Sequence, residues 1–140
     1  MQALKFLGDL YRRLGQDQRA IRYYGLAIEA APGDPRAYFL LGAMYVAAGN
    51  DAAARRIYLK AQRFGKFRAE SFNNLGAIDF RRDKINQSLW YLRRAVKLRP
   101  RASRYHYNLA LSLSRTRQAD EALLEIETAL QLEPDHPESN

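Results

Sequence analysis

Residues able to do chemistry are few and scattered in this 140-residue sequence. The chain has no cysteine, which excludes disulfides, thiolate zinc sites and cysteine nucleophiles. Its two histidines, His106 and His136, are 30 positions apart, and two histidines without cysteine leave a zinc site short of ligands. There is no P-loop, no dinucleotide-binding glycine motif and no nucleophile elbow. The sequence therefore predicts a protein that is not an enzyme and that holds no cofactor or metal.

The composition of the chain further limits its possible class and location. Hydrophobic residues make up 47% of the chain, which is enough for a core, and the formal net charge of +8 favours an acidic partner. No apolar run approaches the roughly 20 residues that a membrane span needs. The first residues, MQALKFLGDL, lack the features of a signal peptide. We expect a soluble protein, and both cytoplasm and periplasm are compatible with a chain that lacks cysteine.

A repeat of 34 residues organises the whole chain. Four rows that start at Met1, Pro35, Ala69 and Ser103 align without a gap, and a residue's repeat position is counted from the start of its row. Small residues recur at positions 8, 20 and 27, and large ones recur at positions 7 and 24. The small residues are Gly8, Gly42, Gly76 and Ala110 at position 8, Ala20, Ala54, Ser88 and Ala122 at position 20, and Ala27, Ala61, Ala95 and Ala129 at position 27. The large residues are Leu7, Leu41, Leu75 and Leu109 at position 7, and Tyr24, Tyr58, Leu92 and Ile126 at position 24. Such spacing is typical of helices that pack closely in pairs.

Turn signals separate these helices. Proline near position 32 cannot continue a helix, so it divides one hairpin from the next. Gly15 and Gly49 predict tight turns, and Asp17 and Asp51 are the expected N-caps. The first helices are predicted over about 2–14, 35–48, 69–82 and 103–116, and the second helices over about 18–31, 52–65, 86–99 and 119–132.

Several residues depart from the pattern, among them Lys66 at position 32 and Asp83 and Arg117 at position 15. Gly65 stands close to where other rows have proline, and we expect it to end the helix as a left-handed cap. Asp79 occupies a large apolar position, so its carboxylate should find a partner or reach solvent. His106 occupies a core position, which predicts a packing residue whose ring nitrogen is hydrogen-bonded.

These columns resemble the tetratricopeptide repeat family, with its W-x2-L-G-x2-Y…A-x3-F…P pattern. Row one carries Leu4, Leu7, Gly8, Tyr11, Ala20, Tyr24, Ala27 and Pro32, and row two carries Tyr38, Leu41, Gly42, Tyr45, Ala54, Tyr58 and Ala61. The resemblance implies an all-α, right-handed α-solenoid of four helix-turn-helix hairpins, a single domain over 1–136 with repeats 1–34, 35–68, 69–102 and 103–136. Residues 137–140 would start a further repeat or form a tail, and we expect the chain to be a fragment of a longer array.

The resemblance also implies a non-catalytic scaffold for protein–protein interaction. Its concave groove, lined by the first helices, would hold a peptide or helix of a partner protein. Positions 2, 5, 6, 9, 12 and 13 face away from the helix pair and are expected to have no duty in the core. The residues expected to contact the partner are Lys5, Phe6, Asp9, Arg12, Phe39, Leu40, Ala43, Val46, Asn73, Asn74, Ala77, Arg81, Arg104, Tyr107, Asn108, Leu111 and Arg115.

Charge suggests two alternatives. The net charges of the four rows are +1, +6, +5 and −4, the last including the tail. A basic convex patch is expected from Arg56, Lys60, Arg63, Arg93, Arg94 and Lys97, with Trp90 partly exposed beside it. This patch could be a solvated face, or could bind an acidic protein, the acidic fourth row of another copy, nucleic acid or an anionic surface. The other alternative is self-association through the terminal hairpins, with Leu123 and Leu130 exposed at one end.

Overall fold

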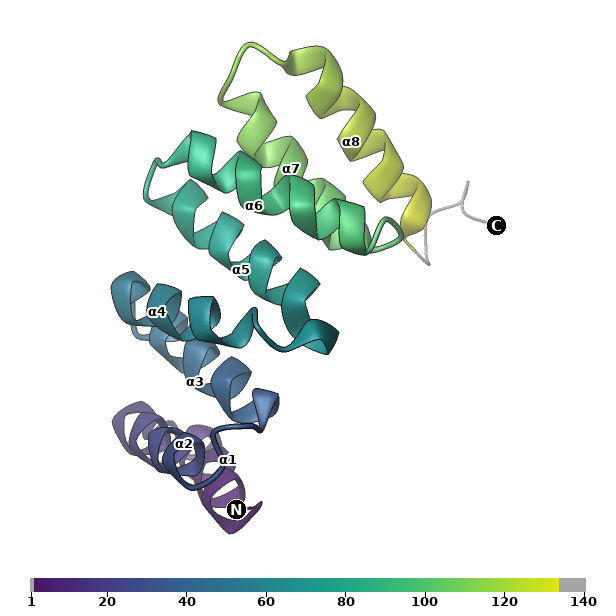
Figure 1. Ribbon diagram of the computed structural model, residues 1–140. Coiled ribbons are helices and arrows are strands. Elements are labelled where there is room, and N and C mark those ends of the chain that lie inside the picture. The colour runs from purple at the N-terminus through teal and green to yellow at the C-terminus, as the bar shows by residue number, and fades with distance from the viewer. Residues whose placement is uncertain (1, 134–140) are drawn as a thin grey trace. The chain divides into compact units, whose positions relative to one another are not determined.

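The structure, a computed structural model, describes residues 2–133, and these contain helices and turns but no strand. The elements are α1 (Gln2–Arg13), α2 (Asp17–Ala30), α3 (Pro35–Ala47), α4 (Asp51–Ala61), the 3-10 turn η1 (Gly65–Phe67), α5 (Arg68–Arg81), α6 (Ile85–Leu98), α7 (Ser103–Ser114) and α8 (Ala119–Leu132) (Figure 1). The all-α prediction is confirmed. Pro134, His136 and the expected start of a further repeat at Pro137 lie outside the described residues.

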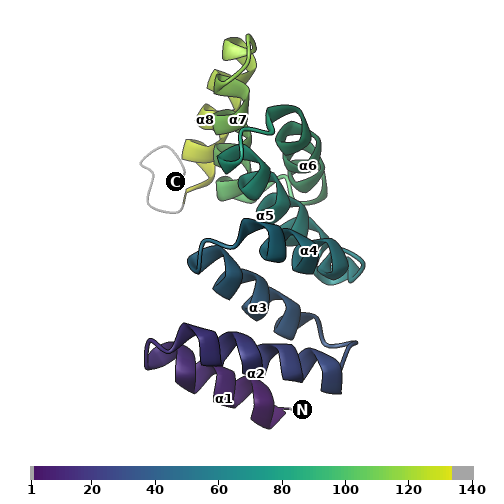
Figure 2. The same ribbon diagram turned by 90° about the vertical axis from the view of Figure 1, so that its left-hand side faces the viewer.

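Consecutive helices pair as hairpins, and the hairpins form two compact units. Unit 1 ends at Phe67 and contains α1–α4, and unit 2 begins at Arg68 and contains α5–α8. Within unit 1, α2 packs on α3, and within unit 2, α7 packs on both α5 and α6 (Figures 1 and 2). The helical hairpins are therefore as predicted, while the single domain and the right-handed superhelix stay predictions.

The close approach within each hairpin depends on the small residue at position 8. A Cβ added to Gly42 would lie 2.6 Å from the ring of Tyr58, and one added to Gly76 would lie 2.5 Å from Leu92 Cγ. Tyr58 is 4% exposed and Leu92 is fully buried, so neither side chain can turn outward to make room. Glycine is needed here because a large side chain of the second helix lies directly on the backbone of the first.

Stacking between hairpins follows one register in both units. The second helix of one row places its positions 17 to 28 against positions 6 to 11 of the next row's first helix. In unit 1 the contributors are Ala20, Ile21, Tyr24 and Ile28 of α2 with Leu40, Leu41, Met44 and Tyr45 of α3. In unit 2 they are Ile85, Leu89, Leu92 and Val96 of α6 with Leu109 and Leu113 of α7.

The turns inside the hairpins confirm one prediction and correct another. Gly15 and Gly49 have φ values of 74° and 77°, as a tight left-handed turn requires. The predicted N-caps Asp17 and Asp51 are instead the first helical residues of α2 and α4. The left-handed residue ends the preceding helix one residue earlier than expected, so the cap falls on the residue that follows it.

The prediction for Gly65 is wrong. α4 ends at Ala61, and Gly65 begins η1 without entering the left-handed region of backbone conformations. The ring of Phe64 lies 5.4 Å from that of Tyr38, and the ring of Phe67 lies 4.9 Å from that of Phe39. These aromatic contacts with α3 draw the chain into tight turns after α4, so no glycine cap is needed.

The two unusual core residues are both buried. Asp79 is 1% exposed, so it does not turn to solvent. His106 is 6% exposed, with Nδ1 2.5 Å from Glu125 Oε2 and Nε2 2.7 Å from the carbonyl oxygen of Pro100. The prediction of a hydrogen-bonded packing histidine is confirmed.

Candidate partner-binding surfaces

A polar groove of about 270 Å³ lies between α1 and α3 in unit 1. It is lined by Gln2, Lys5, Phe6, Asp9, Arg36 and Leu40. All six side chains occupy repeat positions 2, 5, 6 or 9, which the sequence places away from the helix pair. The structure thus brings predicted residues of two rows into one groove, here called the α1–α3 groove, and binding of a partner there stays a prediction.

Lys5 has a structural role that the sequence did not reveal. It is 9% exposed, and its Nζ lies 2.5 Å from Asp34 Oδ2. Asp34 also caps α3, because its Oδ1 accepts a hydrogen bond of 3.1 Å from the backbone N–H of Arg36. The expectation that Lys5 has no duty in the core is wrong, since it ties α1 to the start of α3. The hydrogen bond from Lys5 lowers the pKa of Asp34 against the opposing effect of burial.

This ion pair predicts acid sensitivity. Because the folded Asp34 carboxyl binds its proton less tightly than the unfolded one, its stabilisation is present above the ordinary value of 3.8 and is lost as pH falls through the lowered pKa. Asp34→Asn keeps a capping side chain and should lower the free energy of unfolding by about 1 kcal/mol at neutral pH. The gap should narrow as pH falls below 3.8, so it should be smaller at about pH 3 than at about pH 7.

Urea unfolding followed by far-UV circular dichroism measures that gap at both pH values. Asp17→Asn is the matched control, since Asp17 is exposed at the start of α2. A gap that stays constant with pH would show that the Lys5 pair contributes nothing through its charge.

Among the other residues of the α1–α3 groove, some side chains are fixed by a hydrogen bond and others are exposed to solvent. Asp9 accepts a hydrogen bond from the Tyr24 hydroxyl, whose pKa is raised first by burial and then by this bond. Phe6 is 63% exposed, and Gln2 and Arg36 are exposed as well. A ligand would therefore meet an aromatic ring, an amide and a guanidinium, with Lys5 and Asp9 fixed behind them.

The apolar side chains predicted on α3 are partly covered within unit 1. The ring of Phe39 lies 5.9 Å from that of Tyr58, in addition to its contact with Phe67. Leu40 packs against the core cluster, and Val46 is half-buried. Of this predicted set on α3, only Ala43 is exposed.

In unit 2 several of the predicted residues have partners within the unit. Asn73 is 3% exposed, and its Oδ1 accepts a 2.9 Å hydrogen bond from Asn108 Nδ2, so the expectation of no core duty is wrong for Asn73 as well. The cause is direct packing of α5 on α7. Two ion pairs of 3.6 Å join Arg104 to Glu70 and Arg115 to Asp83. Asn74, Ala77 and Leu111 are half-buried, and Arg81 and Tyr107 are exposed.

The predicted basic patch divides between the units. Arg56, Lys60 and Arg63 belong to unit 1, and Arg93, Arg94 and Lys97 to unit 2; all six are exposed. Several already have partners within their own unit. Arg63 donates to the Pro32 carbonyl at 3.2 Å, and Arg93 forms an ion pair with Glu121. Arg94 lies 3.5 Å over the ring of Trp90, which is 50% exposed as expected.

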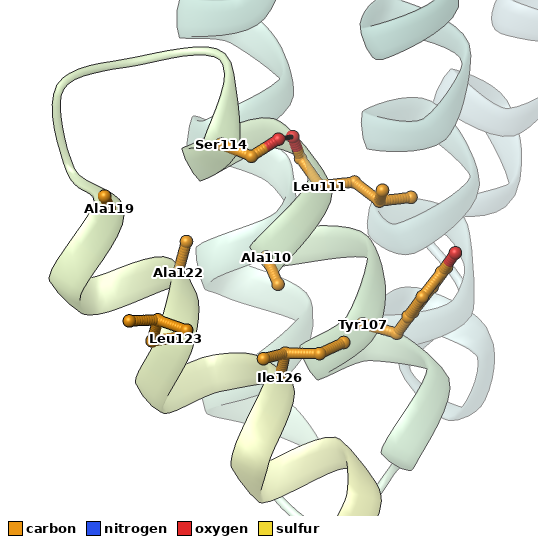
Figure 3. Close-up of a pocket in the computed structure, with 8 residues that line it drawn as sticks. All are labelled: Tyr107, Ala110, Leu111, Ser114, Ala119, Ala122, Leu123 and Ile126. Atoms are coloured by element: carbon orange, nitrogen blue, oxygen red, sulfur yellow. Dashed lines mark hydrogen bonds between the residues drawn. The ribbon is translucent and has the colours of Figure 1, made fainter.

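A second groove, almost wholly apolar, lies between α7 and α8 (Figure 3). Its volume is about 370 Å³, and it is lined by Tyr107, Ala110, Leu111, Ser114, Ala119, Ala122, Leu123 and Ile126. Only Tyr107 and Leu111 belong to the predicted set of partner-contacting residues. The exposure expected for Leu123 and Leu130 is confirmed, at 59% and 41%, and it is the signal from which this α7–α8 groove could have been found.

Residues 2–133 offer neither a membrane-spanning helix nor a cluster of metal ligands. None of the helices described is long and apolar enough to cross a membrane. Within the same residues, no group of three or more histidine, cysteine, aspartate or glutamate side chains is placed to hold a metal ion.

Comparison with known proteins identifies the repeat. Three family models, each described as tetratricopeptide repeat, match residues 1–44, 35–64 and 75–137. Protein CTR9 homolog from Arabidopsis thaliana is 30% identical over 101 residues, which is 68% of this chain but only 9% of that protein.

Solved structures agree in fold. The crystal structure of MamA superposes with a TM-score of 0.83 at 26% identity, covering 91% of this chain and 75% of that one. YrrB, described as a TPR protein with an unusual peptide-binding site, superposes with a TM-score of 0.77 at 17% identity, covering 92% of this chain and 66% of that one. The chain therefore belongs to the tetratricopeptide repeat family.

Proposed function

We propose that this chain is a protein-interaction scaffold that binds a segment of a partner protein in the α1–α3 groove. The observation that carries the proposal is the convergence of six side chains from two repeats on one groove. The tetratricopeptide fold supports a scaffold, and such proteins generally have no catalytic activity. YrrB, which shares the fold and is described as having a peptide-binding site, supports a peptide as the bound element.

The exposed groove residues indicate what the peptide should carry. Phe6 offers an aromatic surface of the kind that anchors apolar side chains at interfaces. The Arg36 guanidinium can bind a carboxylate through two parallel hydrogen bonds, and the amide of Gln2 can pair with a peptide backbone. An extended segment with an apolar side chain next to an acidic group fits this set best.

Arg36→Glu should weaken binding of such peptides by tenfold or more, because a charge-assisted hydrogen bond is replaced by repulsion. Peptides are first selected on the wild-type protein from a displayed random library, and their affinities are then measured by calorimetry. Arg22→Glu is the matched control, since it makes the same change on an exposed site of α2. If the library yields no binder, or if both variants bind equally well, the groove is not the site.

A further inference from the structure

We infer that the α7–α8 groove receives α1 and α2 of a second copy of this chain, so that copies associate head to tail. This goes beyond the proposed function, because it concerns the α7–α8 groove and a second copy as the partner, although both contacts use Phe6. Hairpins already stack within each unit in a fixed register, and the same register applied to α8 of one copy and α1 of another gives this contact.

Side chains at the rim of the α7–α8 groove are those that the next hairpin covers elsewhere. Ala119, Ala122, Leu123 and Ile126 occupy positions 17, 20, 21 and 24 of their repeat. Residues at positions 20, 21 and 24 of α2, and at positions 17, 21 and 24 of α6, pack on the following first helix. On α8 they face an open groove instead, and Leu123 is 59% exposed (Figure 3).

The matching face is exposed on α1. Phe6, Leu10 and Leu14 are 63%, 38% and 68% exposed, at positions 6, 10 and 14. At positions 6 and 10 of the next row, Leu40 and Met44 of α3 pack against α2. α1 therefore presents to solvent the face that α3 uses to stack on the preceding hairpin.

Repeat positions that contact each other between the two hairpins of unit 2 can be compared with the same positions at the junction between copies, where α7 and α8 of one copy would meet α1 and α2 of the next. Asn108 donates to Asn73 between positions 6 and 5, and the same positions at the junction hold Phe6 and Tyr107, an aromatic pair. Ser88 and Ser112 lie 2.7 Å apart at positions 20 and 10. At the junction these positions hold Ala122 and Leu10, an apolar pair.

The ion pair between α6 and α8 in unit 2 has a counterpart at the junction in which the basic and acidic residues are exchanged. Arg93 at position 25 pairs with Glu121 at position 19 of the next row. At the junction, position 25 holds Glu127 and position 19 holds Arg19, so the charges are again opposite. The junction within unit 1 has no charged pair at these positions, which hold Gly25 and Ala53.

One contact opposes association. The ion pair of Asp83 with Arg115 joins positions 15 and 13, which at the junction hold Arg117 and Arg13. Both arginines are exposed, so their repulsion is screened by solvent and weakens the contact without preventing it.

The larger charge pattern agrees with a second copy as the occupant. The fourth row with its tail carries −4, while rows one and two carry +1 and +6. The two contacting faces differ, so the contact is heterologous and generates a ring or an open chain of copies.

Charge exchange tests the inference. Glu127→Arg and Arg19→Glu each place like charges at the junction and should weaken association about tenfold. In an equal mixture the two variants can alternate, which places opposite charges at every junction, so the mixture should associate much more strongly than either variant alone. Sedimentation velocity over a wide range of concentration measures the mass, and circular dichroism checks that the variants fold. A wild type that stays monomeric, or a mixture that stays as dissociated as its components, would overturn the inference.

A second variant should act in the opposite direction. Arg117→Asp replaces the repulsive contact with the pair seen between Asp83 and Arg115, and should tighten association two- to fivefold, about what an exposed pair contributes. Weaker or unchanged association would contradict the register. Arg36→Glu, which disrupts the α1–α3 groove, should leave association unchanged, so the two proposals fail separately.

Discussion

Leu92→Ala should lower the free energy of unfolding of unit 2 by about 3–4 kcal/mol. Leu92 is fully buried on α6, where it contacts Leu109 and Leu113 of the next hairpin and lies against the backbone of Gly76. Truncation removes apolar contacts on two sides and leaves a cavity that rigid neighbouring helices cannot close. Since domains of this size have a total stability of about 5–15 kcal/mol, the loss should be visible as partial unfolding under mild conditions.

The single tryptophan makes the measurement specific to unit 2. Trp90 lies on the same helix, with its ring 6.3 Å from that of Phe72 and 5.0 Å from that of Tyr91, so its fluorescence reports whether α5 and α6 remain paired. The urea midpoint should fall strongly for Leu92→Ala. Leu98→Ala is the matched control, because Leu98 is on α6 but 50% exposed, and it should cost less than about 1 kcal/mol. Equal shifts would show that stacking of α6 on α7 does not stabilise the unit.

The helices could be predicted from sequence because their causes are local. Small and large residues at fixed spacing, proline between hairpins and glycine in the turns each act within a few residues. The exception after α4 is instructive. Gly65 carries the signal of a helix cap, but Phe64 and Phe67 pack against Tyr38 and Phe39, which are far away in sequence. These tertiary contacts determine the conformation of the chain after α4, and rules based on neighbouring residues in sequence cannot predict them.

The candidate grooves were predicted in part for a related reason. The face of each first helix follows from periodicity, and the expected set contains Lys5, Phe6, Asp9 and Leu40 of the α1–α3 groove but not Gln2 and Arg36. What each of these side chains does depends on residues far away in sequence. Lys5 bonds to Asp34 at the end of its own row and Asn73 bonds to Asn108 of the next row, and neither pair can be seen in the periodicity of a single helix. Comparison of position 5 with position 6 of the next row would have suggested the second pair.

Position 4 and position 23 show how one row can replace an apolar contact with a polar one. At these positions rows one to three hold Leu4 and Tyr23, Tyr38 and Ile57, and Phe72 and Tyr91, while row four holds His106 and Glu125. The side chains of His106 and Glu125 are only 8% and 18% exposed. Because the Pro100 carbonyl can only accept a hydrogen bond, Nε2 must donate to it, and Nδ1 is left to share one proton with the Glu125 carboxyl.

Glu125→Leu should therefore cost about 3–5 kcal/mol, the usual effect of removing one partner from a buried polar pair. The loss comes from the histidine that remains, since its Nδ1 can no longer reach a partner or water. Glu127→Leu makes the same substitution at an exposed site of α8 and should change stability by less than about 0.5 kcal/mol. Urea unfolding of both variants by circular dichroism, at concentrations low enough to suppress association, gives the comparison.

The double variant His106→Phe with Glu125→Tyr separates the cost of breaking the pair from the value of the pair itself. It installs in row four the aromatic contact that Phe72 and Tyr91 make in row three, where the ring centroids are 5.9 Å apart. Replacement of a buried polar pair by packed apolar groups is often neutral or stabilising, so the double variant should recover most of the stability lost in Glu125→Leu. If it is instead as unstable as the single variant, the fourth hairpin depends on the histidine–glutamate pair itself, and the repeat positions are not interchangeable between rows.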